Sequence, residues 1–223
     1  MIPLLLALAL PQVADSGILV IRQDSTLIAR ESFHTSPGPT SGGWILDANV
    51  RYDRSRPVVQ LAPIVQVGSD LAAVKVQFDA GDPGSPLHII GQVGRHRFTL
   101  RYVSRSDERA RELPDPGRAV VVDDSVFSLF TPVAWLVRGG AGTVSAIFPR
   151  PGVAETWTVR DEGLVSTGPG SGGGGGGLDF RLRLVSVESP RLGTIRVWMD
   201  AAGRLAKVEI PRLHLSAERQ AGR

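Results

Sequence analysis

The chain has 223 residues, of which 42% are hydrophobic and 21% are charged, and it contains no cysteine. This composition supplies enough apolar surface for one packed core, and it excludes intrinsic disorder, disulfides and thiolate metal sites. The formal net charge is +3, but acidic residues are interspersed with the arginines instead of leaving one basic face or tail, so we expect no nucleic-acid partner.

The N-terminus is typical of a signal peptide. An apolar run extends from Met1 to Leu10, Pro11 follows, and Ala14 is a small residue suited to cleavage. This run is too short to cross a bilayer as a helix, and no later run reaches the roughly 18 residues required. The sequence predicts a leader over residues 1–14, a single β-rich domain over residues 15–223 without a transmembrane span, and export to the periplasm or the extracellular space. A buried N-terminal strand is the alternative for the leader.

Short runs rich in β-branched residues, separated by turn-forming residues, predict five strands in the first part of the chain. These strands are Ile18–Arg22, Thr26–Phe33, Trp44–Tyr52, Pro57–Val67 and Leu71–Phe78. Pro57 and Pro63 favour an edge position for the fourth strand, because proline cannot donate to a ladder.

The second part of the chain contains clearer alternation. Leu87–Ser104 is predicted as one strand with arginines on one face and Phe98, Leu100 and Tyr102 on the other. Leu178–Leu184 repeats the pattern with leucines facing the core, and Thr194–Met199 and Leu205–Ile210 form a closing hairpin. We expect about ten to twelve strands, and hence an all-β domain.

One helix is predicted over Val126–Val137. Asp123, Asp124 and Ser125 offer N-cap chemistry, and Pro132 is expected to divide the helix into two short pieces. The helix is apolar nearly all round and therefore has to be buried. The predicted architecture is a curved antiparallel sheet, either a half-barrel or a barrel, with an apolar helical plug. The glycine-rich residues 168–177 are interpreted as a loop within this domain.

Aromatic residues provide the candidate ligand site. If the helix can leave the sheet, they line a cavity for an apolar ligand; otherwise they pack the core. The candidates are Phe98, Tyr102, Phe127, Phe130, Trp135, Phe180 and Trp198. Arg95, Arg97 and Arg101 are candidates for contact with anionic lipid headgroups or a polyanion, and a solvated outer face is the simpler interpretation.

The sequence carries no recognisable catalytic or metal motif. It has no Gly-x-Ser-x-Gly elbow and no His-Glu-x-x-His pair, and its four histidines are scattered. Asp15-Ser16-Gly17 matches the aspartic-protease triplet but lies at the expected cleavage point, and Asp123-Asp124 is better explained by helix capping. We expect no metal and no cofactor. An enzyme whose residues converge only in the fold stays an open alternative.

The layout resembles the half-barrel superfamily that includes the periplasmic lipoprotein carriers of the Lol type. The resemblance is carried by the opening hairpin of residues 17–33, the strands that follow, the apolar plug and the closing hairpin around Val197–Leu205. The absence of cysteine departs from the lipid-anchored receptors of that group. The resemblance implies a protein that holds a lipid or another apolar ligand on the concave face of its sheet. The alternative is a cell-envelope assembly or interaction module that docks a protein through its sheet edges or its arginine face.

Overall fold

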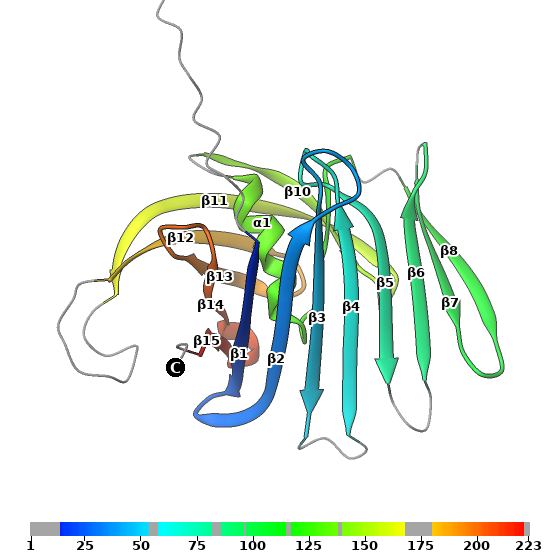
Figure 1. Ribbon diagram of the computed structural model, residues 1–223, viewed down its shortest axis with the longest axis horizontal. Coiled ribbons are helices and arrows are strands. Elements are labelled where there is room, and N and C mark those ends of the chain that lie inside the picture. The colour runs from blue at the N-terminus through cyan, green and yellow to red at the C-terminus, as the bar shows by residue number, and fades with distance from the viewer. Residues whose placement is uncertain are drawn as a thin grey trace, which may run out of the picture.

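The computed structural model describes residues 14–53, 58–81, 86–95, 97–114, 117–137, 140–167 and 180–220. Fifteen strands within these ranges form one sheet, in the order β8-β7-β6-β5-β4-β3-β2-β1-β15-β14-β13-β12-β11-β10-β9 (Figure 1). The sheet is not closed into a barrel, because β8 and β9 remain its two edges. The all-β prediction is therefore confirmed, with more strands than the ten to twelve expected.

Two runs of sequential neighbours build this sheet, and β1 and β15 join them. The first run contains β1 (Asp15–Gln23), β2 (Thr26–Pro37), β3 (Trp44–Tyr52), β4 (Val59–Val67), β5 (Ala73–Gly81), β6 (Leu87–Val93), β7 (Arg97–Val103) and β8 (Glu108–Pro114). The second contains β9 (Ala119–Val121), β10 (Ala141–Phe148), β11 (Val153–Thr167), β12 (Phe180–Ser189), β13 (Gly193–Met199), β14 (Leu205–Ile210) and β15 (Leu215–Arg219). Neighbouring strands are antiparallel except for β9 and β10, which are parallel.

The join between β1 and β15 was not predicted, and it connects segments about two hundred residues apart. Its register runs from Leu19 opposite Arg219 to Gln23 opposite Leu215. Beyond it, the Arg219 guanidinium forms an ion pair with the buried Asp15 carboxylate and donates from Nε to Leu205 O at 2.7 Å. Asp15, the first residue of the protease-like triplet, therefore has a structural partner at this join.

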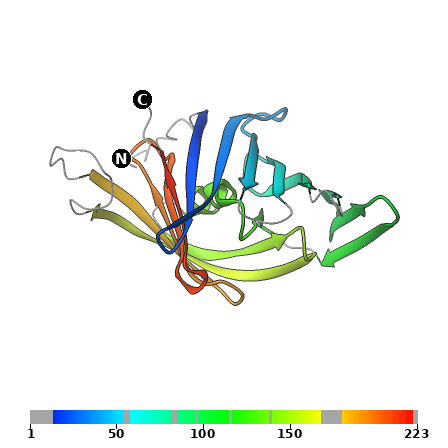
Figure 2. The same cartoon turned by 90° about the horizontal axis from the view of Figure 1, so that it is seen from below.

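Alternating side chains of both halves of the sheet form one core. In β3, Trp44, Leu46, Ala48 and Val50 are buried, and the residues between them are more exposed, as expected for a strand with one wet face. Figure 2 shows the two halves curving towards each other with the helical segment between them. That segment, which we call the plug, consists of a 3₁₀ helix, η1 (Phe127–Phe130), followed directly by α1 (Thr131–Leu136).

The division of the plug at proline is confirmed. Pro132 lies in the first turn of α1, where its missing N–H costs no intrahelical hydrogen bond. Every side chain of the plug is buried except those of Trp135 and Leu136, which are partly buried. α1 has six residues, and no helix in the described part of the chain approaches the length and hydrophobicity of a bilayer-spanning segment.

Two strand predictions are corrected by the topology. Leu87–Ser104 is a hairpin, β6 and β7, whose turn is closed by the Gly94 N–H donating to Arg97 O at 2.7 Å. β4 is an interior strand, although it contains Pro63. The ladder between β3 and β4 is interrupted opposite Ala62 and Pro63, so the missing donor is accommodated by a local gap instead of an edge position.

β12 also departs from expectation, because its buried face is the opposite one. Val185 and Val187 are fully buried, whereas Leu182 and Leu184 are only partly buried. Arg183 shares the inward face and donates from Nε to Asp161 Oδ1 at 2.9 Å. Residues 1–13 of the predicted leader and the glycine-rich loop at 168–177 lie outside the described residues.

Candidate functional site

Aromatic side chains of the plug pack against the inner face of the second half of the sheet. Phe130 stacks on Trp157 of β11 with ring centroids 6.1 Å apart and planes 7° apart. Phe148 of β10 meets the same indole edge-on at 5.8 Å. Phe127 lies 6.4 Å from Phe130, and all four rings are buried. The plug thus completes the apolar core on the inner face of this half of the sheet.

The start of the plug is capped by a carboxylate from another strand. Glu31 of β2 is 0% exposed, and it accepts hydrogen bonds from the N–H of Phe127 (2.7 Å) and of Ser128 (2.8 Å). The first N–H groups of a helix have no intrahelical acceptor. Glu31 accepts two of them and so acts as an N-cap side chain supplied by another strand. Burial raises the pKa of Glu31 to about 7, although the hydrogen bonds that it accepts from Ser128 and Phe127 oppose the shift.

The predicted capping role of Asp123 and Asp124 is wrong. The N-cap residue of η1 is Val126, which has no side-chain cap. Asp123 instead accepts the Ser125 N–H at 2.9 Å, which shapes the turn before the plug, and both of its oxygens accept from Arg150, at 2.6 and 2.7 Å. Arg150 also reaches Asp124 Oδ1 at 2.9 Å. Burial raises the pKa of the Asp123 carboxyl, and the hydrogen bonds and charge of Arg150 oppose that change.

Tyr52 adds a third attachment from β3. Its hydroxyl donates to Ser125 O at 2.8 Å, and burial raises its pKa. Glu31, Tyr52, Asp123, Asp124 and Arg150 together form what we call the polar anchor. It ties the segment leading into the plug to β2, to β3 and to the turn between β10 and β11.

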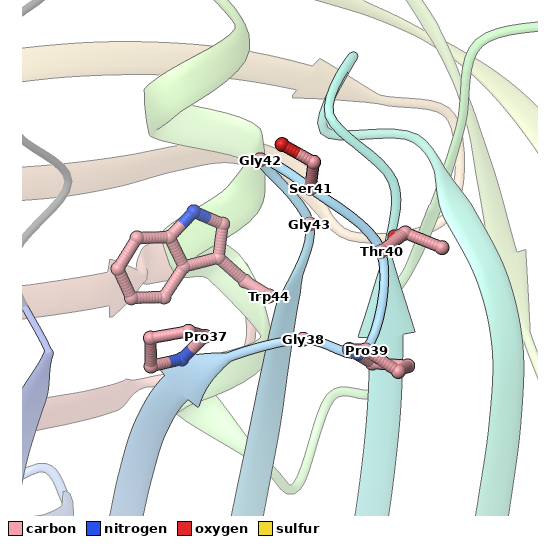
Figure 3. Close-up of a pocket in the computed structure, with 8 residues that line it drawn as sticks. All are labelled: Pro37, Gly38, Pro39, Thr40, Ser41, Gly42, Gly43 and Trp44. Atoms are coloured by element: carbon pink, nitrogen blue, oxygen red, sulfur yellow. The ribbon is translucent and has the colours of Figure 1, made fainter.

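The far end of the plug has separate attachments. Trp135 donates from Nε1 to Gly203 O in the β13–β14 turn at 3.0 Å, and its ring meets Trp44 edge-on at 6.0 Å. Trp44 ends the loop of residues 37–44, which surrounds a shallow open pocket of about 470 Å³ (Figure 3). A second pocket of about 240 Å³ is lined by Arg118, residues 136–137 and residues 140–144. Both pockets lie near the C-terminal end of the plug, and the plug's phenylalanines line neither.

The candidate ligand-binding aromatics do not form one group. Phe127 and Phe130 belong to the plug, and Trp135 lies at its end. Phe98 and Tyr102 are buried on β7, where the Tyr102 hydroxyl donates to Pro149 O at 2.9 Å. Trp198 lies on the opposite face from its buried neighbours Val197 and Met199, with the Lys207 ammonium 5.5 Å above its ring. The side chain of Phe180 lies outside the described residues.

The candidate arginines are partly neutralised by a strand that was not predicted. β8 supplies Glu112, which accepts from Arg97 at 2.9 Å, and Glu108, which accepts from Arg101 at 2.6 Å. Arg95 is exposed in the β6–β7 turn. The outer face of β7 and β8 therefore carries paired charges instead of an uninterrupted basic stripe.

One signal in the sequence could have revealed part of the polar anchor. Ala29, Glu31 and Phe33 share one face of β2, and all three are buried. A carboxylate at an apolar position of an amphipathic strand indicates a buried partner. Arg150 had no comparable signal, since only the fold brings it to Asp123. Among the described residues, no three His, Asp or Glu side chains are grouped to hold a metal ion.

These features define an open, curved all-β sheet that encloses an apolar plug fastened at both ends. Comparisons with protein-family profiles, with curated proteins and with solved structures gave no match for the chain.

Proposed function

We propose that the protein binds and carries a lipid or another apolar ligand on the concave face of its sheet, and that the plug occupies the ligand's place in the unloaded state. One observation carries this proposal. The plug is an apolar segment outside the sheet whose buried side chains fill the concave side, while its identified polar fastenings lie at its two ends.

The energetics of such an exchange are reasonable. Displacing the plug removes the contacts of Phe127, Leu129 and Phe130 with the sheet. An acyl chain of about 16 carbons that took their place would recover on the order of 10 kcal/mol, at roughly 0.8 kcal/mol for each buried CH₂. A ligand of that size could therefore offset the loss of the plug's own contacts.

The closed plug also carries a local energetic cost. Thr131 Oγ1 is buried and has no hydrogen-bond partner among the described residues. An unsatisfied buried hydroxyl costs roughly 1–3 kcal/mol, which displacement of the plug into water would relieve. The two open pockets beside the C-terminal end of the plug favour that end as the entrance.

Export belongs to the same proposal. β1 begins at Asp15, directly after the predicted leader, and the Asp15 N–H donates to Thr35 Oγ1 at 2.9 Å. N-terminal sequencing of protein recovered from a periplasmic extract should give a chain that starts close to this residue. An uncleaved cytoplasmic product would overturn the export proposal and leave ligand binding to be tested separately.

The test of carriage is native mass spectrometry of the purified protein, followed by denaturation and extraction into organic solvent. A discrete co-purifying lipid would support the proposal. Delipidated protein should then take up a fluorescent palmitate analogue, and lack of uptake of both this probe and a labelled phospholipid would overturn it.

Two variants shift the plug in opposite directions. Trp135→Phe removes the hydrogen bond to Gly203 O but keeps an aromatic ring beside Trp44, so uptake should become several-fold faster. Thr131→Val removes the unsatisfied hydroxyl at nearly constant shape, so uptake should become slower. Trp198→Phe is the matched control on the outer face and should leave uptake unchanged. If the three variants take up the palmitate analogue alike, the plug is not the gate.

The alternative function is that of an envelope interaction module. One observation supports it, namely the open edge of the sheet at β8.

A further inference from the structure

Within the described ranges, the edge strand β8 has a neighbouring strand on one side alone, so part of its backbone hydrogen-bonding groups have no ladder partner there. The Ser104 N–H donates to Asp107 O at 2.9 Å in the β7–β8 turn. Because hydrogen-bonded and non-hydrogen-bonded pairs alternate in an antiparallel ladder, Arg109, Arg111 and Leu113 bond to β7. Glu108, Ala110 and Glu112 direct their N–H and C=O groups to the open edge, which lies at one extreme of the molecule (Figures 1 and 2).

The two faces of β8 differ in charge. On the outer face, Glu108 and Glu112 are already paired with Arg101 and Arg97. On the inner face lie Arg109 and Arg111, both exposed, and neither has an acidic partner among the described residues. Two guanidinium groups thus follow one side of the open edge at a spacing of two residues.

The two arginine side chains have different neighbours. The Arg109 guanidinium lies over the Tyr102 ring, 5.0 Å from its centroid. Arg111 runs past the β10–β11 turn, where a Cβ added to Gly152 would lie 2.9 Å from its Cδ. The Arg109 guanidinium thus rests on the Tyr102 ring and the Arg111 stem lies beside the turn, while both residues remain exposed.

Self-pairing of β8 with a second copy of the chain is disfavoured in the registers centred on the middle of the strand. Two-fold antiparallel pairing of β8 centred on Ala110 places Arg109 opposite Arg111 and Glu108 opposite Glu112. Centring the pair on Arg111 places that residue opposite itself. Like charges directly opposite one another destabilise a strand pair, and charged edges protect a sheet from self-association.

We infer that β8 docks an extended segment of a partner protein that carries acidic residues at alternate positions with uncharged residues between them. The segment adds a strand to the open edge. Its acidic side chains lie opposite Arg109 and Arg111 on the inner face, and its uncharged side chains lie opposite the paired glutamates on the outer face. This surface is distinct from the plug, so its test is independent of the carrier proposal.

The experiment uses a labelled seven-residue peptide of alternating threonine and glutamate, with the matching threonine–lysine peptide as control. Fluorescence anisotropy on the intact protein at low salt should give at least tenfold tighter binding for the glutamate peptide, and added salt should weaken it. Equal binding of the two peptides would overturn the inference.

Two variants separate the backbone and charge contributions. Ala110→Pro removes an N–H that points to the open edge and leaves the bonds to β7 intact, so it should reduce binding at least tenfold without lowering the unfolding midpoint appreciably. Arg109→Glu combined with Arg111→Glu should reverse the preference towards the lysine peptide. Undiminished binding by Ala110→Pro, or concentration-dependent dimerisation of the wild type that this variant abolishes, would contradict the inference.

Discussion

Glu31 is a carboxylic acid on the apolar face of β2, and its burial makes stability depend on pH. Its pKa is raised from 4.5 to about 7 in the folded protein, so the folded state binds the proton more tightly than the unfolded chain. The contribution of this group to stability is fully present below pH 4.5 and is lost as the pH rises through 7. The difference corresponds to about 3 kcal/mol.

We therefore expect Glu31→Gln to flatten the pH dependence of stability. The wild type should lose free energy of unfolding between pH 5 and pH 8, and the variant should lose clearly less, as measured by urea denaturation at both values. Asp123, whose pKa is also raised, acts on stability with the same sign in the pH range where it titrates. The exposed Glu188→Gln variant is the control and should keep the wild-type slope. Identical slopes for all three proteins would refute this account of Glu31.

Arg150 and Arg51 test the effect of burial on an ion pair. Arg150→Gln leaves the Asp123 carboxylate, whose side chain is 2% exposed, without its ion-pair partner, so we expect a loss of about 3 kcal/mol. Arg51→Gln breaks the exposed pair with Asp53 and should cost less than about 1 kcal/mol.

Thermal or urea unfolding of the two arginine variants measures this difference. Adding Asp123→Asn to Arg150→Gln should recover part of the loss, because the uncompensated charge disappears. Equal losses for Arg150→Gln and Arg51→Gln would show that the polar anchor contributes no more than a surface pair.

At the scale of elements, the packing of β6 between β5 and β7 depends on Gly91. A Cβ at this position would lie 2.5 Å from Val76 Cγ1 and 2.6 Å from Phe98 Cε1. Gly91→Ala should therefore destabilise the protein by about 1–3 kcal/mol through overpacking. Gly142→Ala, at a β10 position with nothing within 4 Å of the added atom, is the matched control. Comparable denaturation midpoints for the two variants would contradict the close packing of β6.

Some strands with one apolar face were predicted with correct bounds, whereas β10 was missed although it buries Val144, Ala146, Ile147 and Phe148, and two strands without such a face were missed as well. β3 and β14 have their predicted bounds, because alternation and turn residues both mark them. β8 buries only Leu113, and β15 buries only Ala217, so neither carries a clear hydrophobic period. β8 is stabilised by pairing at an edge, and β15 by two flanking strands that are distant in sequence.

The hairpin within Leu87–Ser104 is indicated in the sequence by a change of parity. Inward residues are odd-numbered before the turn (Ile89, Gly91) and even-numbered after it (Phe98, Leu100), which one unbroken strand cannot achieve. The plug was predicted because its sequence is continuously apolar. The polar attachments at its two ends were not predicted. Glu31, Arg150 and Gly203 lie in three segments that are distant in the sequence, and only the closed fold brings them to the plug and to the residues just before it.

At the scale of the whole molecule, β15 holds the two halves of the sheet together. Ser216 lies opposite Arg22 of β1 and Glu209 of β14, so Ser216→Pro removes a ladder hydrogen bond in the middle of the sheet. We expect a loss of about 3 kcal/mol or more. The same substitution at Ala110, on the edge strand β8, should cost far less.

Urea unfolding of the two proline variants, followed by tryptophan fluorescence, measures that contrast. If the urea midpoint of Ser216→Pro were close to that of Ala110→Pro, the pairing of β15 with its two neighbours would contribute little to holding the two halves of the sheet together.

The register of β1 and β15 has a mechanical consequence. The Gln220 N–H donates to Ile18 O, and Arg219 lies opposite Leu19, so residues 15 and 220 emerge at the same end of this strand pair. A force that pulls these two residues apart would load the hydrogen bonds one after another, as in a zipper, instead of all at once. In a single-molecule stretching experiment, the centre of this broad sheet should therefore yield at low force. Attaching the pulling points at residues 15 and 214 instead would load the same bonds in shear, and the molecule should resist more strongly.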